Sequence, residues 1–359
     1  MEKMMKMMKA AVLDAPFKLE VREVPVPKPG PDEALIKVHC IGICGSDVHY
    51  YEHGRIGRYE VKQPLILGHE LAGVVVETGE RVTNVRAGDR VAVEPGVTCG
   101  KCAYCKSGRY NLCPEVAFMA TPPVDGAWAD YVTVRSDFLF PLPVEMSFEE
   151  GALLEPLSVG FHAVKRGRIQ PYDRVLVLGL GPIGLLALEA AKMFGASQVF
   201  GSDVVEFRRK LALDMGAQEV FDPSAPGSLE ERLAPLTGGE GFDLIIETSG
   251  NPGAIADTIR FAKRGGRIVL VGLPAKDAVP VDIGALIDAE LDVCGVFRYA
   301  NTYPAAIEIL GRAKQDIRKI ITHKFPLSDI KNAVELARTN KETSVKVMIY
   351  PGGGELGEN

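Results

Sequence analysis

The stretch VLVLGLGPIG, residues 175–184, places three glycines in the order G-x-G-x-x-G directly after an apolar run. In a strand–turn–helix context, Gly179 permits a tight turn, Gly181 lets the backbone approach a pyrophosphate, and Gly184 allows close packing of helix on strand. Pro182 suits the start of the following helix, because its missing N–H would be unpaired there anyway. The stretch therefore predicts the first strand, turn and helix of a dinucleotide-binding fold.

From about residue 170 onward, the chain alternates apolar strands with helical segments that stop at glycine. Strands that are almost continuously Val, Ile and Leu are typical of a parallel sheet covered by helices on both faces. Six such strands fit a complete doubly wound fold. They lie at 173–179, 198–203, 219–223, 242–250, 266–272 and 291–297.

An aspartate ends the second of these strands. Asp203 lies nineteen residues beyond Gly184, where a carboxylate can accept both hydroxyls of an adenosine ribose. Because it would repel a 2′-phosphate, the sequence favours NAD over NADP, although Arg208 one helical turn further on leaves room for the phosphorylated form. The simpler alternative is that Asp203 only caps the helix that follows.

The first part of the chain has a different pattern. Residues 9–150 contain short strand-like runs broken by Gly and Pro, which is typical of a mainly β segment with loop insertions. After Arg298 the strand–helix alternation stops, and we expect the remaining tail to return to the first domain. A chain of 359 residues is also long for a single hydrophobic core, so two domains are expected.

Composition and charge exclude several classes of function. The net charge of −6 disfavours a nucleic-acid-binding protein, which needs a basic face. No apolar run approaches the ~20 residues of a membrane span, and the N-terminus MEKMMKMMKAAVL lacks the apolar core of a secretory signal. We therefore expect a cytoplasmic protein that binds neither nucleic acid nor membrane.

Four of the seven cysteines lie within fifteen residues, at Cys99, Cys102, Cys105 and Cys113. In a cytoplasmic chain such a cluster indicates metal binding rather than disulfides. Four thiolates at this spacing predict a closed, tetrahedral, structural zinc site. The alternative is four unrelated free thiols.

A second set of metal-ligand residue types is spread more widely. His69 and Glu70 are adjacent, Cys44 lies upstream, and Glu155 lies in an apolar segment downstream. A cysteine, a histidine and one or two carboxylates suit a zinc ion with an open position, as in a catalytic site. The alternative is a loop histidine beside a surface glutamate.

These motifs resemble the zinc-dependent medium-chain dehydrogenase/reductase superfamily, over essentially the whole chain from Lys9 to Tyr350. Residues 68–82 match its zinc signature G-H-E-x2-G-x5-G-x2-V, and the four-cysteine lobe, the glycine motif and the aspartate follow in the family's order. Three stretches resemble its sorbitol (polyol) dehydrogenase branch. They are CGSDVHYYEHGRIG (44–57), ALLEPLSVGFHAV (152–164) and GVFRYANTYP (295–304).

The resemblance implies an α/β fold in which a GroES-like, mainly β catalytic domain is joined to a Rossmann domain with a doubly wound parallel sheet. Residues 1–157 are expected to form the catalytic domain, with the structural zinc lobe at about 95–114. Residues 158–297 are expected to form the NAD-binding domain, and 298–359 to return to the catalytic domain. The branch also implies a homotetramer with two zinc ions per subunit, one catalytic and one structural.

The resemblance further assigns roles at the catalytic zinc. Cys44, His69 and Glu70 are expected to hold the ion together with a water molecule, which Glu155 contacts. Alcohol dehydrogenases have a directly ligating cysteine at the position of Glu155, so whether Glu70 or Glu155 binds zinc in the resting state stays open. Glu155 with a water can also act as an acid or base.

The resemblance also implies a route for the proton. Ser46 and His49 match the family's relay, which runs from the reacting hydroxyl through Ser46 and the nicotinamide ribose to His49 at the surface. The alternative is that His49 is only a solvated loop histidine. Asp47 is expected to bond the far nitrogen of His69 and to fix its tautomer.

The substrate and cofactor contacts also follow from the resemblance. An arginine and a tyrosine just after the last sheet strand suit a substrate with several hydroxyls, although Arg298 could simply close the cleft between the domains. The implied substrate contacts are Tyr50, Phe118, Thr121, Glu155, Arg298 and Tyr299. The implied cofactor contacts are Gly179, Gly181, Pro182, Ile183, Gly184, Asp203, Arg208, Gly272, Leu273, Val296, Phe297 and Arg298.

The resemblance thus predicts an NAD- and zinc-dependent enzyme that reversibly oxidises a secondary hydroxyl of sorbitol, xylitol or a related polyol to the ketose. L-Threonine 3-dehydrogenase is an alternative, since it shares the cysteine, the His-Glu pair and the four-cysteine lobe, but Tyr50 and residues 297–299 favour a polyol. A non-catalytic dinucleotide-binding protein on the same fold is an alternative of another class. The presence of Cys44, His69 and Glu70 together argues against it.

Overall fold

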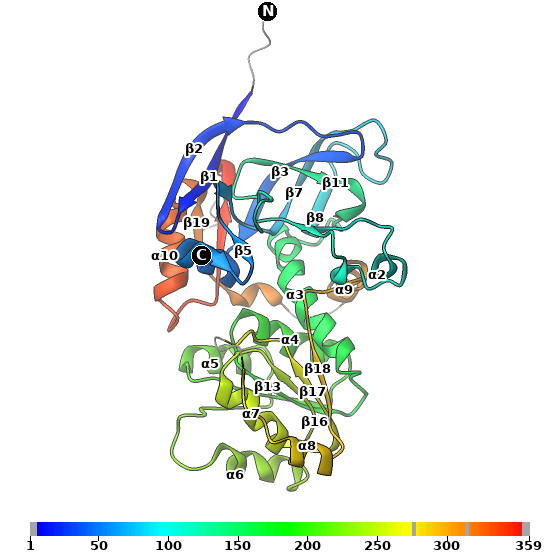
Figure 1. The fold of residues 1–359 in the computed structure, drawn as a ribbon, viewed down its shortest axis with the longest axis vertical. Helices are drawn as coiled ribbons and strands as arrows, with labels where there is room; N and C mark the ends of the chain where they lie inside the picture. The colour runs from blue at the N-terminus through cyan, green and yellow to red at the C-terminus, as the bar shows by residue number, and fades with distance from the viewer. Residues whose placement is uncertain (1–5, 275–277, 313–315, 354–359) are drawn as a thin grey trace, which may run out of the picture. The chain divides into compact units, whose positions relative to one another are not determined.

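The computed structural model describes residues 6–274, 278–312 and 316–353 (Figure 1). The chain divides into two compact units, one of Met1–Glu155, Tyr303–Gly311 and Ile321–Asn359, the other of Pro156–Thr302 and Arg312–Ile320. The sequence pattern predicts divisions at 157 and 297. It does not predict that a short segment after Gly311 also belongs to the second unit.

The first unit is built around a seven-stranded sheet with the order β12-β8-β7-β3-β20-β19, in which β11 also pairs with β3. Alternate side chains of its central strands, such as Ile36, Val38 and Leu71, are buried in one large apolar core. The strands are β3 (Glu33–Gly42), β7 (Glu70–Thr78), β8 (Arg90–Val93), β11 (Tyr131–Arg135), β12 (Leu139–Pro141), β19 (Ile321–Pro326) and β20 (Lys346–Tyr350).

Smaller elements complete the first unit. A three-stranded sheet has the order β2-β1-β6, and two short hairpins pair β4 with β5 and β9 with β10. These strands are β1 (Met7–Ala15), β2 (Lys18–Pro25), β6 (Leu65–Ile66), β4 (Arg55–Ile56), β5 (Tyr59–Glu60), β9 (Gly96–Val97) and β10 (Ala117–Phe118). The helices are α1 (Gly45–His53), α2 (Ala103–Lys106), α9 (Tyr303–Arg312), α10 (Ile330–Thr339), and the 3-10 turns η1 (Tyr110–Leu112), η2 (Ser136–Phe138), η5 (Leu327–Asp329) and η6 (Pro351–Gly353).

The second unit is a six-stranded parallel sheet with the order β15-β14-β13-β16-β17-β18. Val175, Leu176 and Val177 have no exposed surface, which is why the run reads as continuously apolar rather than alternating. The strands are β13 (Arg174–Leu178), β14 (Gln198–Ser202), β15 (Glu219–Phe221), β16 (Phe242–Glu247), β17 (Ala262–Leu270) and β18 (Asp292–Gly295). The predicted doubly wound parallel sheet is confirmed.

Helices connect these strands, as Figure 1 shows. They are α4 (Pro182–Met193), α5 (Glu206–Asp214), α6 (Leu229–Leu233), α7 (Pro252–Phe261), α8 (Ile283–Asp288), η3 (Ala234–Thr237) and η4 (Ile317–Ile320), and the division between the units falls inside α3 (Phe148–Arg166). Among the helices in the described part of the chain, none has the length and apolar character needed to cross a membrane.

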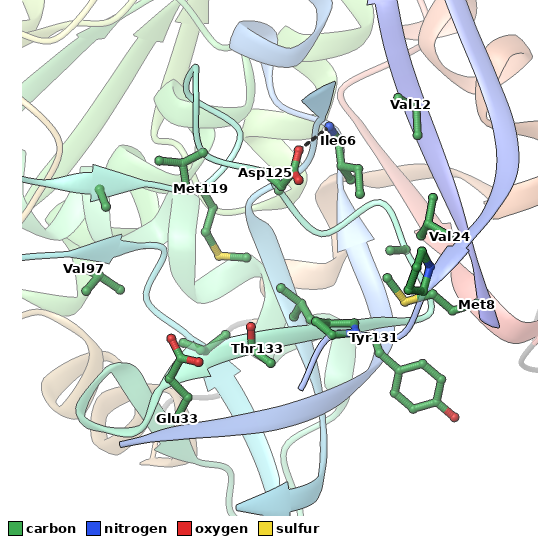
Figure 2. A pocket seen from close by; sticks show the side chains of 18 of the residues that line it. Met8, Val12, Val24, Glu33, Ile66, Val97, Met119, Asp125, Tyr131 and Thr133 are labelled. Atoms are coloured by element: carbon green, nitrogen blue, oxygen red, sulfur yellow. Dashed lines mark hydrogen bonds between the residues drawn. The ribbon is translucent and has the colours of Figure 1, made fainter. Parts of the chain in front are cut away.

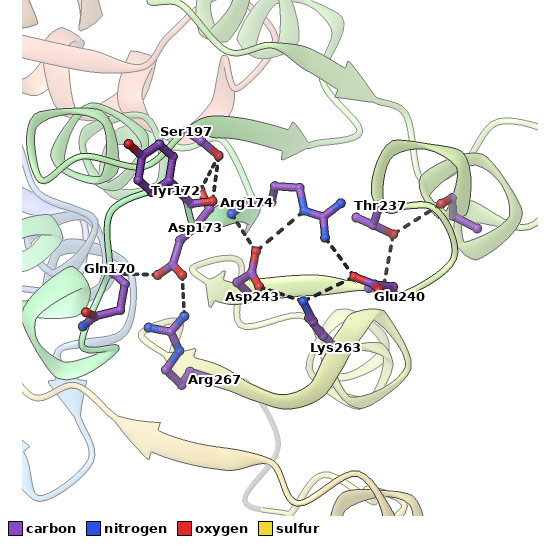
Figure 3. A network of polar contacts seen from close by, with 12 residues as sticks. Gln170, Tyr172, Asp173, Arg174, Ser197, Thr237, Glu240, Asp243, Lys263 and Arg267 are labelled. Carbon is purple, nitrogen blue, oxygen red and sulfur yellow. Dashed lines mark hydrogen bonds and ion pairs between the residues drawn. The ribbon is translucent and has the colours of Figure 1, made fainter.

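Charged side chains are networked near the amino-terminal ends of β13 and β16 (Figure 3). Asp243 accepts the backbone N–H of Arg174 at 2.9 Å, and its other oxygen lies 3.6 Å from the Lys263 ammonium. Arg267 donates to Asp173 at 2.8 Å. These contacts join neighbouring strands at their amino-terminal ends, whereas the glycine motif follows the carboxyl end of β13. They therefore contribute to stability and not to cofactor binding.

Candidate functional site

The four clustered cysteines converge in the loop that carries α2 and η1. Their ligand atoms all lie within 4.8 Å of one another, and Cys102 Sγ is 3.5 Å from Cys105 Sγ, which is 3.9 Å from Cys99 Sγ. Tetrahedral zinc with Zn–S bonds of about 2.3 Å places its sulfurs about 3.8 Å apart, so the spacing fits this ion. Backbone N–H groups, those of Lys101 and Cys102 foremost, lower the pKa of Cys99 to about 7 and so favour the thiolate that binds metal.

The second group of ligand atoms belongs to Cys44, His69 and Glu70, again within 4.8 Å of one another. Cys44 directly precedes α1, while Glu70 begins β7 and His69 directly precedes it. Both His69 and Glu70 are buried, at 5% and 1% exposed. One thiolate, one imidazole and one carboxylate form a donor set that suits zinc with an open position, so these residues fit the implied metal.

Asp47 organises this corner from α1. Its carboxylate accepts the backbone N–H groups of Cys44 at 2.9 Å and Gly68 at 3.1 Å, and Oδ1 lies 3.6 Å from His69 Nδ1. Asp47 thus faces Nδ1 of His69, as predicted, although the distance is longer than that of a hydrogen bond. This orientation leaves Nε2 of His69 for a metal. Burial lowers the pKa of His69, but the negative charges of Asp47 and Cys44 outweigh it and raise the pKa well above its ordinary value. The same charges favour a metal cation there.

A lysine that the sequence reasoning missed completes the corner. Lys346, the first residue of β20, is 2% exposed and places Nζ 2.7 and 2.6 Å from the two oxygens of Glu70 and 3.0 Å from the carbonyl of Ile43. Burial alone would lower the pKa of Lys346. The negative charges of Glu70, Cys44 and, more weakly, Glu155 outweigh burial, so that the pKa lies above its ordinary value. The signal in the sequence was a charged residue inside the apolar run VKVMIY.

The remaining predicted residues of the first unit lie on several of its elements. The Phe118 ring centroid lies 5.5 Å from that of His69, Tyr50 and Glu155 are buried, and Thr121 is half-buried in the loop after β10. Ser46 and His49 lie on α1, with Ser46 half-buried and His49 exposed. Partial burial, aided by His53 with its ring 4.6 Å away, lowers the pKa of His49.

A separate hollow of about 680 Å³ lies elsewhere on the first unit (Figure 2). Its walls are mainly apolar and include Met8, Val12, Ile66 and Met119, and a hydrogen bond of 2.9 Å from Ile66 N to Asp125 closes one side. The described residues that line it include none of the candidate metal ligands. Because the hollow lies apart from these ligands, we do not assign substrate binding to it.

The cofactor pocket of the second unit has a volume of about 600 Å³ and is lined by Gly179, Gly181, Asp203 and Arg208, among others. Gly179 has a φ of +87°, and a Cβ on Gly184 would lie 1.9 Å from the Gly179 carbonyl oxygen. Both positions therefore require glycine, one for the turn and the other for the close packing of α4 on β13.

The Asp203 carboxylate makes two backbone hydrogen bonds, one in the glycine turn and one just before α5. Its carboxylate accepts the backbone N–H groups of Leu180 at 2.7 Å and of Val205, which caps α5, at 2.8 Å. Arg208 lies 3.8 Å away. Since a carboxylate has about four lone-pair positions, acceptor capacity remains for ribose hydroxyls in the pocket.

The other predicted cofactor contacts occupy the start of α4 and the segments that follow β17 and β18. Pro182 and Ile183 open α4, Gly272 and Leu273 follow β17, and Val296 and Phe297 follow β18. Arg298 and Tyr299 belong to this second unit. Arg298 has a φ of +52° and its guanidinium lies 4.9 Å from the Phe297 ring.

Known proteins resemble this chain along almost its whole length. The family model for the alcohol dehydrogenase GroES-like domain matches residues 30–144, and that for zinc-binding dehydrogenases matches residues 182–312. The chain is 46% identical over 344 residues to the sorbitol dehydrogenase of Bacillus subtilis (strain 168), covering 96% of this chain and 97% of that one. The chain belongs to the zinc-dependent medium-chain dehydrogenases, in the sorbitol dehydrogenase branch.

Solved structures of these dehydrogenases share the fold. An Escherichia coli oxidoreductase/dehydrogenase of unknown specificity superposes with a TM-score of 0.92 at 37% identity, covering 97% of this chain and all of that one. An E. coli CFT073 alcohol dehydrogenase complexed with NADH gives 0.89 at 29% identity, covering 96% and 99%. As a zinc-dependent medium-chain dehydrogenase, the chain is an oxidoreductase that acts on a CH–OH group of a small molecule, with NAD and zinc as cofactors.

Replacement of Lys346 by methionine should destabilise the metal-free enzyme by about 3–5 kcal/mol, because it leaves the Glu70 carboxylate buried and unpaired. Zinc should restore part of this loss, since a cation beside Cys44 and Glu70 replaces the missing ammonium charge. Thermal melts with zinc and with a chelator measure the two effects.

Lys324→Met is the matched control, because Lys324 pairs with Glu149 at 2.8 Å in the same unit but is 33% exposed. This variant should lose about 1 kcal/mol or less, equally in both conditions. An equal loss for Lys346→Met with and without zinc would show that Lys346 does not compensate the charge of the metal-binding corner.

Proposed function

We propose that the chain oxidises a secondary hydroxyl of sorbitol, xylitol or a related sugar alcohol to the ketose, with NAD as the hydride acceptor. The observation that carries this proposal is the convergence of Cys44, His69 and Glu70 in a chain that is 46% identical to a sorbitol dehydrogenase. The two alternatives, threonine oxidation and a non-catalytic protein, are not favoured by these relatives.

The residues of the first unit divide the chemistry among them. Cys44, His69 and Glu70 would hold the catalytic zinc, which when bound lowers the pKa of an alcohol at its open position. The buried Glu155 carboxylate lies within electrostatic reach of the same corner and is proposed to hold or return the proton of the reacting hydroxyl. Phe118, beside His69, helps to exclude water.

Proton release to solvent is assigned to α1. The Ser46 hydroxyl is proposed to accept the proton near the reacting centre and to pass it toward His49. His49 is exposed, and its lowered pKa keeps the imidazole neutral and able to accept a proton at neutral pH. Glu155 with a water is a parallel route for the same proton.

Polyol recognition is proposed from the resemblance. In the first unit, Tyr50, Thr121 and Glu155 offer donors and acceptors for hydroxyl groups. In the second unit, the resemblance assigns substrate contacts to Arg298 and Tyr299. The pocket after β13 would hold NAD, with Asp203 on the adenosine ribose. Two zinc ions per subunit are proposed, the second held by Cys99, Cys102, Cys105 and Cys113.

Self-association is proposed through the edge of the second unit's sheet. Within the described residues, β18 is the last strand of that sheet, and Val293, Ile287 and Ile283 near it are 44%, 70% and 54% exposed. An edge strand beside exposed apolar side chains is a typical site for pairing with another copy. The homotetramer and the cytoplasmic location stay predictions from the resemblance and the sequence.

Substrate preference is tested by NADH formation with sorbitol, xylitol, arabinitol, galactitol and threonine. We expect turnover of one or more polyols at a kcat/KM at least about tenfold above that for threonine, because a multi-hydroxyl pocket loses hydrogen bonds with a small amino acid. Turnover of threonine alone would refute the polyol assignment. Absence of turnover with every compound in the zinc-loaded enzyme would favour the non-catalytic alternative.

Zinc content separates the two metal sites. The purified enzyme should contain about two zinc ions per chain, and His69→Ala and Cys105→Ser should each retain about one. Because only the first variant removes a ligand of the catalytic ion, the loss of activity in His69→Ala should follow directly from the loss of that ion. Elemental analysis beside activity measures this, and one zinc ion in the wild-type enzyme would contradict the proposal.

A further inference from the structure

A buried carboxylate that the proposed chemistry does not use lies at the carboxyl end of β16. Glu247 has no exposed surface. The strand order of the sheet changes direction between β13 and β16, and open parallel sheets bind ligands outside the carboxyl ends of their strands at such a point. Glu247 is therefore placed at the base of the cofactor crevice, where an uncompensated charge would be costly.

The Glu247 side chain organises the loop that follows it. Oε1 accepts the backbone N–H of Ser249 at 2.8 Å, the Ser249 hydroxyl, and the backbone N–H of Gly250 at 3.0 Å. The backbone carbonyl of Glu247 accepts the N–H groups of Val271 at 2.8 Å and Gly272 at 3.1 Å. One residue thus fixes both of the loops that leave β16 and β17 at the crevice.

The loop after Glu247 packs directly on the glycine turn of the cofactor pocket. Thr248 donates its backbone N–H to Leu178 O and its hydroxyl to Gly179 O, both at 2.8 Å. A Cβ on Gly179 would lie 2.8 Å from the Ser249 nitrogen. Thr248 and Ser249 also line the cofactor pocket, so a shift of this loop changes the pocket itself.

Gly272 packs closely against the carboxylate and against Gly250. A Cβ on Gly272 would lie 2.2 Å from the Gly250 nitrogen and 2.8 Å from Glu247 Oε2. Burial raises the pKa of Glu247, while the hydrogen bonds from Ser249 and Gly250 favour its charged form. Since every group that faces Oε1 is a donor, the side chain serves as an acceptor, and only an oxygen can replace it.

We propose that Glu247 is a positioning residue for NAD. Its carboxylate holds Thr248 and Ser249 against the Gly179 turn, and this contact sets the width of the pocket that receives the dinucleotide. The inference rests on NAD binding to the second unit and is independent of which alcohol is oxidised. The alternative is that Glu247 only stabilises the fold.

The test is the affinity of the full-length, zinc-loaded enzyme for NADH, titrated by fluorescence without an alcohol, together with the melting temperature. Glu247→Ala should weaken NADH binding by about tenfold or more, because several hydrogen bonds that shape the pocket are lost. Glu247→Gln keeps an oxygen for the Oε1 position and should bind NADH within about threefold of the wild type. Glu247→Asp, which keeps the charge but is too short, should fall between them.

Glu189→Ala is the matched control. Glu189 is also buried, at 2% exposed, and pairs with Lys192 on α4, but it does not line the cofactor pocket. Its replacement should lower the melting temperature and leave the NADH affinity unchanged. The inference is overturned if Glu247→Ala binds NADH like the wild type, or if Glu189→Ala loses as much affinity. Should the alanine variant not fold, wild-type affinity in Glu247→Asp overturns it equally.

Because no alcohol takes part in this titration, its outcome is separate from that of the substrate panel. A wild-type enzyme that binds NADH but oxidises no polyol would refute the proposed function and leave the role of Glu247 open to the same measurement. If the Glu247 variants have altered NADH affinity but keep the polyol specificity of the wild type, the result supports the positioning role of Glu247 without bearing on the substrate assignment.

Discussion

The ion pair between Glu70 and Lys346 is the contact on which the metal-binding corner depends. The two residues are 276 positions apart in the chain, and their side chains meet at 2.6 Å with almost no exposure. They begin β7 and β20, which flank β3 in the sheet. Gly42 on β3 makes the room, because a Cβ there would lie 2.0 Å from a Glu70 carboxylate oxygen.

This arrangement determines the charge of the site. Cys44 follows β3 by two residues and so lies beside the carboxylate that the lysine holds. The Cys44 thiolate and the carboxylates of Glu70 and Asp47 would repel one another without compensation. Lys346 supplies one positive charge from inside the protein. A metal cation supplies the rest, which explains how so many anionic groups can share a buried corner.

In the second unit, the two ends of the parallel strands have different roles. At the amino-terminal ends of the strands, the network of Asp243, Arg174 and Lys263 joins neighbouring segments (Figure 3). At the carboxyl ends of the strands, hydrogen bonds instead shape the cofactor pocket. Glycines there leave space for the neighbouring backbone and for the ligand. The direction of parallel strands therefore decides which buried charges hold the fold and which position the cofactor.

Local patterns in the sequence were sufficient for much of this. The apolar strands, the glycine motif and the spacing from Cys99 to Cys113 each depend on neighbours in the chain, and the structure gathers them as expected. Lys346 could not be assigned, because nothing near it specifies that β20 pairs with β3. The assignment of η4 to the second unit and the contacts of Glu247 likewise arise only from tertiary packing.

In the structure proposed here, one zinc ion is bound by four sulfurs and another by Cys44, His69 and a carboxylate. X-ray absorption spectroscopy at the zinc edge measures this directly in the purified enzyme. Averaged over the two sites, we expect about 2.5 sulfur neighbours per zinc at about 2.3 Å, together with nitrogen and oxygen neighbours at about 2.0–2.1 Å. In Cys105→Ser, the remaining zinc should show about one sulfur. A spectrum with four sulfurs per zinc and no nitrogen or oxygen neighbours would contradict the account.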